Sequence, residues 1–302
     1  MDQTLVGSAT HIRSSEAHHS LWSDTWRRLL KDRAAVAGAV ICLLLVMVAL
    51  LAPWLAPHPP NLGYIEGLSE RGGPVVPNRI FLLGTDSLGR DELSRLIWGA
   101  RVSLFVGILG NGLSVIIAIF LGAMAAFLGG NVEMVIMRFT DVMMAFPTLL
   151  LAIALSAVLR PGVDVLIIVI AAVYWVYLAR IIHGRVLSLK EMEFVHAARS
   201  LGASRWWNLT RHILPHLASE SVVYASLGVA STVLLEAELS YLGLGIRLPI
   251  ASWGGMIAEG QAYYRSAPWL ILSPGVMLML TVLGFNLMGD GLRDALDPHQ
   301  RR

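Results

Sequence analysis

Two stretches of this chain are long, apolar and free of charged residues, and they decide what the chain can fold into. Residues 34–55 and residues 102–131 contain no Asp, Glu, Lys or Arg. A bilayer core is crossed by about 20 consecutive apolar residues in a helix, and lipid forces the backbone of such a segment to bond within itself. At 56% hydrophobic and 15% charged residues, with a mean hydropathy of +0.65, the chain is too apolar for an ordinary soluble domain.

The remaining apolar runs complete a set of six expected crossings in an all-α integral membrane protein. Pro147 falls inside the third run and should bend it, while Gly129–Gly130 and Pro161–Gly162 mark turns. We expect a single transmembrane domain over residues 34–298, without a second domain or an internal repeat. Its predicted crossings are at about 34–55, 101–128, 132–159, 164–183, 218–240 and 267–289.

Residues 1–33 are expected to form a polar cytoplasmic tail followed by a helix lying on the membrane surface. The helix is predicted from apolar residues that share one face, with basic residues around it. Basic residues gather on the cytoplasmic side of membrane proteins, and an even number of crossings returns the chain to that side. Both termini are therefore predicted to be cytoplasmic. The apolar residues are Leu21, Trp22, Trp26, Leu29 and Leu30, and the basic ones are Arg27, Arg28, Lys31 and Arg33.

Residues 191–215 form a polar, basic stretch between two apolar runs, and their pattern predicts a helical hairpin. An apolar stripe of Phe194, Ala197, Ala198 and Leu201 predicts a first helix. Its C-terminus is predicted at Gly202, where a positive φ is often needed. In the second helix we expect Ser204 as the N-cap and Pro215 as the residue that ends or bends the helix. A purely structural cytoplasmic hairpin has the same pattern.

The residues of this stretch resemble the EAA loop of ABC-importer permeases. His-Ala-Ala-x-x-x-Gly ends at Gly202, and His-Ile-Leu-Pro follows after nine residues. In that family the loop docks into a groove on a separate ATPase subunit. The chain departs from the family pattern at His196, where Glu is usual, and at His212, where Ile is usual. The first departure leaves no carboxylate at that position, so the resemblance does not imply an acidic contact with the ATPase there.

Four further segments resemble the dipeptide, oligopeptide and nickel branch of these permeases, and in particular its C-type permease. One of them reads Leu-Gly-Thr-Asp-Ser-Leu-Gly-Arg-Asp-Glu-Leu-Ser-Arg-Leu-Ile-Trp-Gly-Ala-Arg-Val-Ser-Leu, where Asp91 is expected to cap a short helix. Together the resemblance covers about residues 22–298, nearly the whole chain. The segments are residues 26–55, 83–104, 239–256 and 285–298.

The resemblance implies a type I ABC-importer transmembrane domain in a bacterial plasma membrane, acting as a permease for peptides or similar solutes. The implied partners are a homologous second permease, cytoplasmic ATPase subunits, an extracellular or periplasmic solute-binding protein and membrane lipid. The residues implied to couple the permease to the ATPase are Glu193, His196, Ala197, Ala198, Arg199, Ser200, Leu201, Gly202, Ala203, Arg205, Leu214 and Pro215. Dipeptides, oligopeptides, nickel complexes and glutathione all fit the resemblance as substrates.

The sequence offers no catalytic, cofactor or metal constellation, so we expect a non-enzymatic subunit. Lys31 and Lys190 both follow Leu, so no Gly-Lys-Ser/Thr phosphate loop exists and ATP hydrolysis requires another subunit. His212 and His216 lack a third nearby metal ligand, and Cys42 is the only cysteine. A net charge of +2 gives no indication of nucleic-acid binding.

Three acidic residues near the expected crossings are candidates for contact with the transported solute: Asp141, Glu236 and Glu238. Charges at membrane depth are costly and face protein or water. Helix pairing is the structural alternative, and Arg138 lies one turn from Asp141. A functional alternative is an ion- or proton-coupled secondary transporter in which Asp141 and Glu236 are the coupling groups.

Overall fold

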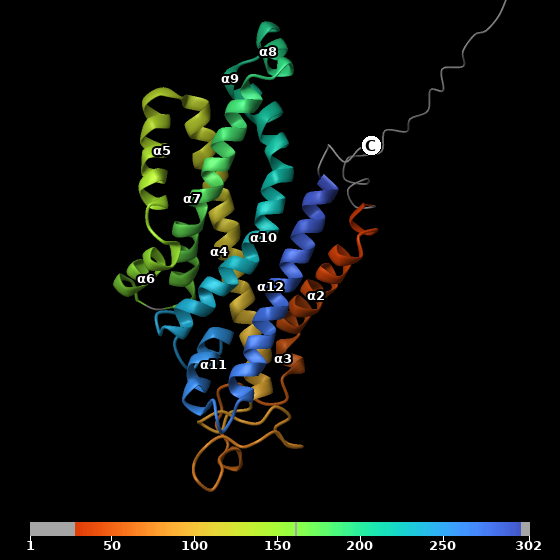
Figure 1. The fold of residues 1–302 in the computed structure, drawn as a ribbon, viewed down its shortest axis with the longest axis vertical. Helices are drawn as coiled ribbons and strands as arrows, with labels where there is room; N and C mark the ends of the chain where they lie inside the picture. The colour runs from red at the N-terminus through yellow and green to blue at the C-terminus, as the bar shows by residue number, and fades with distance from the viewer. Residues whose placement is uncertain (1–27, 161, 297–302) are drawn as a thin grey trace, which may run out of the picture.

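The computed structural model describes residues 28–160 and 162–296, and over those ranges the regular structure is helical (Figure 1). The predicted tail, and all of the interfacial helix before Arg28, lie outside the described residues. The helices are α2 (Arg33–Leu50), α3 (Ala52–Leu55), α4 (Glu92–Leu128), α5 (Gly130–Met144), α6 (Thr148–Val158), α7 (Val163–Lys190), α8 (Glu193–Ser200), α9 (Arg205–Asn208), α10 (Leu214–Tyr241), α11 (Trp253–Gly260) and α12 (Trp269–Leu296), with short 3₁₀ turns at Ile65–Gly67 and Gln261–Tyr263.

The number of crossings depends on how one bent helix pair is counted. Among the described residues, five helical segments are long and apolar enough to cross a bilayer, and α5 with α6 makes a sixth if the pair is one span. The sequence predicts a bend at Pro147, and the structure places a 94° break there. Pro147 precedes the first residue of α6 and has no N–H to continue the helix from α5.

The sequence predicts a short capped helix followed by a separate second crossing, whereas the structure has one continuous helix, α4. The Asp91 carboxylate accepts a hydrogen bond from the Ser94 N–H at 2.9 Å, so the predicted cap is present. The helix then continues for 37 residues without a break, a length of about 55 Å, against a bilayer core of about 30 Å. Residues 92–101 contain no proline, and their single glycine, Gly99, is accommodated within the helix. Nothing in this segment therefore ends the helix before the second crossing begins.

Helices α7 and α10 are also longer than the apolar runs that predicted them. Helix α7 continues to Lys190 rather than ending near residue 183, and α10 begins at Leu214 rather than near residue 218. The basic residues Arg180 and Arg185 end the apolar run, but each has an acidic partner on a neighbouring helix. Charge therefore marks where the bundle becomes polar, not where the helix stops.

The bundle is organised around α4, which packs against α7 and α10 and also contacts α2 and α5. Glycines on α4 bring these backbones close together. A Cβ atom added at Gly122 would lie 2.5 Å from the carbonyl oxygen of Ala179 on α7, and one added at Gly107 would lie 2.3 Å from Val233 on α10. On the other side, α2 packs against α12.

A matched pair of alanine substitutions tests this packing. Gly122→Ala should lower the free energy of unfolding by about 1–3 kcal/mol, because the added methyl group forces α4 and α7 apart. In the same helix, a Cβ at Gly112 meets no described atom within 4 Å. Gly112→Ala should therefore leave stability unchanged or raise it by up to about 1 kcal/mol. Unfolding in detergent measures both, and equal effects would contradict the close approach.

Candidate functional site

The predicted hairpin is present, and it projects beyond the bundle at the end where α7 finishes and α10 begins (Figure 1). Gly202 has a φ of +89°, and the N–H of Ala203 donates to the Ala198 carbonyl, so the first helix ends in the predicted left-handed turn. The Ser204 hydroxyl accepts a hydrogen bond from the Trp207 N–H at 3.2 Å, which is the predicted cap of α9. The local geometry of this hairpin thus follows from the sequence.

The predicted apolar stripe on α8 does not bury itself against the bundle. Phe194 and Ala197 are exposed, and Leu201 is 89% exposed. Val195, which is not part of the predicted stripe, is the residue of α8 that is fully buried. The difference arises because α8 touches the bundle along a narrow line, so one β-branched side chain fills the contact. Most of the predicted apolar face is left open.

Aromatic and polar contacts fasten the hairpin to the bundle. The ring of Trp206 packs on Phe127 at the end of α4, with centroids 4.7 Å apart. The Phe194 ring lies 5.4 Å from His216 near the start of α10. Lys190, the last residue of α7, donates a hydrogen bond to the Ala126 carbonyl at 2.8 Å. The hairpin is therefore held by α4, α7 and α10 together.

Pro215 does not end the second helix of the hairpin, contrary to one of the two predicted outcomes. A π-helical turn, η2 (Leu209–Ile213), follows α9, and the Leu214 N–H donates to the Leu209 carbonyl five residues earlier. Pro215 lies in the first turn of α10, where its missing N–H is tolerated. The wide turn joins α9 to α10 into one helical run over Arg205–Tyr241.

The residues predicted to couple this chain to an ATPase gather on the hairpin and its base. Ala198 and Ala203 are half-buried against the turn, and Leu214 is half-buried at the base. The Nε2 atom of His196 lies 3.6 Å from the Glu191 carboxylate, so the residue that departs from the family pattern faces an acidic neighbour. The exposed members are Glu193, His196, Ala197, Arg199, Ser200, Leu201, Gly202, Arg205 and Pro215.

The three acidic pathway candidates lie in different surroundings. Asp141 forms an ion pair with Arg180 of α7, and not the predicted pair with Arg138. Glu236 is fully buried in α10, where it accepts a hydrogen bond from the Ser240 hydroxyl at 2.7 Å. Glu238 is exposed on the same helix. Sequence spacing favoured the pair within one helix, but the opposing face of α7 supplies a closer cation.

A chamber that sequence analysis missed lies between α4, the α5–α6 break, α7 and α10. Its volume is about 470 Å³, within the range of about 300–1,000 Å³ typical of small-molecule sites. Its lining is neutral, so no charge marked it in the sequence. Methionines and tyrosines at helical spacing were its only signal, and packed cores share that signal. The lining includes Asn111, Met143, Met144, Tyr174, Tyr177 and Tyr224.

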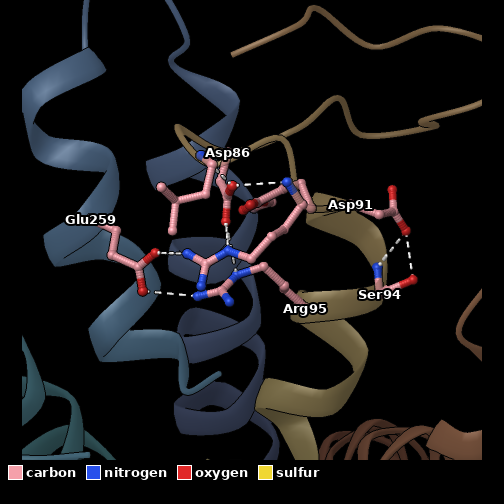
Figure 2. A network of polar contacts seen from close by, with 9 residues as sticks. Asp86, Asp91, Ser94, Arg95 and Glu259 are labelled. Carbon is pink, nitrogen blue, oxygen red and sulfur yellow. Dashed lines mark hydrogen bonds and ion pairs between the residues drawn. The ribbon is translucent and has the colours of Figure 1, made fainter. Parts of the chain in front are cut away.

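A network of charges fixes the opposite end of the bundle (Figure 2). Arg90 and Arg95 both pair with Glu259 of α11, the second through an Nη2–Oε1 distance of 2.8 Å. Both arginines also contact the Asp86 carboxylate, at 2.5 and 3.3 Å. Asp86 and both arginines are almost fully buried. The network joins the loop before α4, the first turns of α4, and α11 into one unit.

A helical bundle with several apolar crossings, a projecting polar hairpin and a neutral chamber defines a multi-pass membrane transport protein. The family model described as binding-protein-dependent transport system inner membrane component matches residues 118–302. The model described as N-terminal TM domain of oligopeptide transport permease C matches residues 20–69. The chain belongs to the binding-protein-dependent transport system inner membrane component family.

Curated relatives match over nearly their whole length. The oligopeptide transport system permease protein OppC of Haemophilus influenzae is 40% identical over 93% of this chain and 90% of that protein. The glutathione transport system permease protein GsiD of Pectobacterium atrosepticum is 39% identical over 92% of this chain and 91% of its own. The dipeptide transport system permease protein DppC of Bacillus subtilis is 37% identical over 94% of this chain and 87% of that protein.

These matches confirm the predicted family and function class. The chain is a permease subunit of an ABC importer, with the all-α transmembrane domain of the type I class, and it lies in a bacterial inner membrane. The alternative of an ion- or proton-coupled secondary transporter is not supported, because the matching family is binding-protein-dependent.

The charge network is expected to stabilise the folded protein, and a single substitution tests this. Glu259→Ala should lower the free energy of unfolding by about 3 kcal/mol, because Arg90 and Arg95 would remain buried with one acidic partner in place of two. Glu238→Ala is the control, since Glu238 is exposed and has no ion pair among residues 28–160 and 162–296; its effect should stay within about 0.5 kcal/mol. Chemical unfolding in detergent compares them, and equal losses would refute the role of the network.

Proposed function

We propose that this permease forms part of the translocation pathway of a peptide importer, and that separate ATPase subunits drive it through the α8–α9 hairpin. The observation that carries the proposal is the hairpin itself: it projects from the bundle, exposes most of the residues predicted for coupling, and continues directly into α10. An element built only to close the bundle would bury its apolar residues, yet Leu201 and Trp206 are exposed.

The contacts of the hairpin support its role in transmitting force. Movement of the hairpin is carried to α10 through the helical run over Arg205–Tyr241, which begins at α9, and to α4 through the Trp206–Phe127 contact. Val195 of α8 is fully buried and adds a packing contact at the base of the hairpin. A displacement at the hairpin therefore reaches two of the helices that enclose the chamber.

The proposed mechanism is alternating access. ATP binding closes the ATPase subunits, the hairpin moves with them as a rigid body, and the pathway opens to the side from which solute arrives. Hydrolysis then resets the assembly. Each state requires contacts that the other lacks, and the ATPase is proposed to make those contacts on the exposed face of α8. Because His196 replaces the usual Glu, the neighbouring carboxylates Glu191 and Glu193 are the acidic groups available there.

The proposed orientation places the hairpin and both termini in the cytoplasm. The described ends of α2 and α12 lie in the half of the molecule that carries α8 (Figure 1), and basic residues such as Arg28, Lys31 and Arg33 precede the first crossing. The proposed partners are a homologous second permease, cytoplasmic ATPase subunits, a solute-binding protein at the opposite end, and surrounding lipid. No catalytic role is assigned to this subunit.

Peptides are the proposed substrate class. Relatives that match this chain along most of their length are named for oligopeptide, dipeptide and glutathione transport, and all three substrates contain peptide bonds and charged ends. Contact of Glu236 or Glu238 with the solute stays a prediction. In this conformation Glu236 is buried against Ser240.

The turn at Gly202 gives one test of coupling. Gly202→Val should uncouple ATP hydrolysis from uptake, since a β-branched residue strains a φ of +89° and misplaces α8 relative to α9. Transport should fall at least tenfold while ATPase activity and membrane content are retained. Gly275→Val is the control, because a Cβ atom added there meets no described atom within 4 Å and Gly275 has no positive φ. Normal transport by Gly202→Val would contradict the proposal.

Crosslinking gives an independent test of partner and orientation. The native Cys42 is buried, so introduced thiols can be followed individually. Cysteines at Ser200 or Ala203 should crosslink to an ATPase subunit in the assembled transporter. Ile65 is 92% exposed in the loop between α3 and α4, and this loop lies at the opposite end of the bundle from α8 (Figure 1). A cysteine at Ile65 should instead reach the solute-binding protein. The reverse pattern would invert the proposed orientation.

A further inference from the structure

The chamber lies near the middle of three of the crossings. Asn111, Tyr174 and Gly228 line it, and each lies well inside its helix, on α4, α7 and α10 respectively. The break between α5 and α6 closes the fourth side with Met144 and Phe146. A solute bound here would contact side chains from all of these elements, so the chemistry of the lining bears on which groups it accepts.

The chemistry of the lining favours uncharged groups. None of the described residues that line the chamber is Asp, Glu, Lys, Arg or His. Two of its polar side chains bond to the backbone: the Tyr174 hydroxyl donates to the Ser231 carbonyl, and the Asn111 amide donates to the Ala225 carbonyl. The groups that meet a solute are neutral hydroxyls, aromatic faces and thioethers, which adapt to varied uncharged shapes. A charge placed there without a partner is costly.

Charges of both signs lie immediately beside this neutral chamber. Tyr177 and Arg180 are three residues apart on α7, and Asp141 and Met144 are three apart on α5, so the chamber residues Tyr177 and Met144 each have a charged neighbour one turn away. Arg180 and Asp141 form an ion pair across the two helices. They line a second groove of about 500 Å³, together with Arg138, Glu133 and His183.

We propose that the chamber and the Asp141–Arg180 pair form one substrate-contacting site, in which an uncharged peptide side chain occupies the chamber and the charged peptide ends face the pair. The proposal rests on the proposed function and adds a selectivity rule to it. A peptide is a zwitterion, and the half-exposed Asp141 and Arg180 side chains can exchange their mutual ion pair for contacts with its two ends, while the neutral chamber disfavours a charged side chain. The site therefore contributes selectivity within the membrane, beyond that of the binding protein.

Affinity labelling tests whether a peptide enters the chamber. The assembled transporter carrying Tyr177→Cys is supplied with ATP, the binding protein and a tripeptide whose middle side chain bears a bromoacetyl group. Labelling of Tyr177→Cys should be fast and should fall at least tenfold in excess Ala-Ala-Ala. Tyr241→Cys, an exposed tyrosine position on α10 outside the chamber lining, should show no such protection. Absent or unprotected labelling of Tyr177→Cys would overturn the proposal.

A change of selectivity gives a second test that a structural role would not produce. Ser231→Asp places a carboxylate in the chamber lining. The ratio of Ala-Lys-Ala uptake to Ala-Ala-Ala uptake should rise about tenfold, as expected for a new charge pair worth about 1.4 kcal/mol. Ser219→Asp, on the same helix outside the chamber, is the control and should leave the ratio unchanged. An unchanged ratio with Ser231→Asp would refute the site.

Removing both charges of the Asp141–Arg180 pair should affect uptake differently from the chamber variants. The double variant Asp141→Asn, Arg180→Gln should raise the KM for both tripeptides several-fold without changing their ratio, because every peptide carries the same two ends. Blocked tripeptides that lack charged ends should be unaffected by the double variant. Equal effects on blocked and free peptides would assign the pair to structure alone.

The outcomes separate this proposal from the proposed function. If the wild-type transporter shows no ATP-dependent uptake of either tripeptide, the peptide substrate class is wrong and the site fails with it. If uptake is ATP-dependent but neither labelling nor selectivity responds to the chamber variants, only the site is refuted. In that case a side chain of the second permease is the expected occupant of the chamber.

Discussion

The close approach of α4 to α7 and α10 is the contact on which the rest of the structure depends. Inside a bilayer the hydrophobic effect gives helices little reason to associate, so van der Waals contact must hold them together. Gly107 and Gly122 allow the backbones to approach nearly as closely as sterics permit. That contact fixes three walls of the chamber and the base of the hairpin. Helix α4 is thus the packing centre of the bundle, and the positions of the chamber walls and of the hairpin depend on it.

Charge is distributed along the molecule in three zones. At one end, Arg90, Arg95, Asp86 and Glu259 lock the outer loop to α4 and α11. The middle of the bundle is neutral at the chamber. At the other end, contacts such as Arg185–Glu220 and His183–Glu133 join α7 to α10 and to α5 below the hairpin. The two polar ends can therefore stay rigid while the apolar middle, which has few directional bonds, accommodates the change between states.

Features that depend on local composition could be predicted from the sequence, whereas contacts between residues far apart in the chain could not. Hydropathy located the apolar crossings, and Gly202 and Ser204 were read correctly because a positive φ and a cap are local demands. Motif resemblance identified the family. The partner of Asp141 was mispredicted, since Arg180 lies on another helix. The link from Arg95 to Glu259 joins residues far apart in the chain, so no spacing rule could find it.

The π turn ahead of Pro215 sets the rotation of α10 about its axis relative to the hairpin. A π turn holds one more residue than an α turn, and one residue corresponds to a rotation of about 100° around the helix axis. Leu227, Gly228 and Ser231 face the chamber with that extra residue in place. Because packing on α4 fixes the inward face of α10, removing the extra residue would rotate the hairpin relative to that face. A five-residue irregularity at the base of the hairpin therefore sets the direction in which the hairpin faces relative to the chamber.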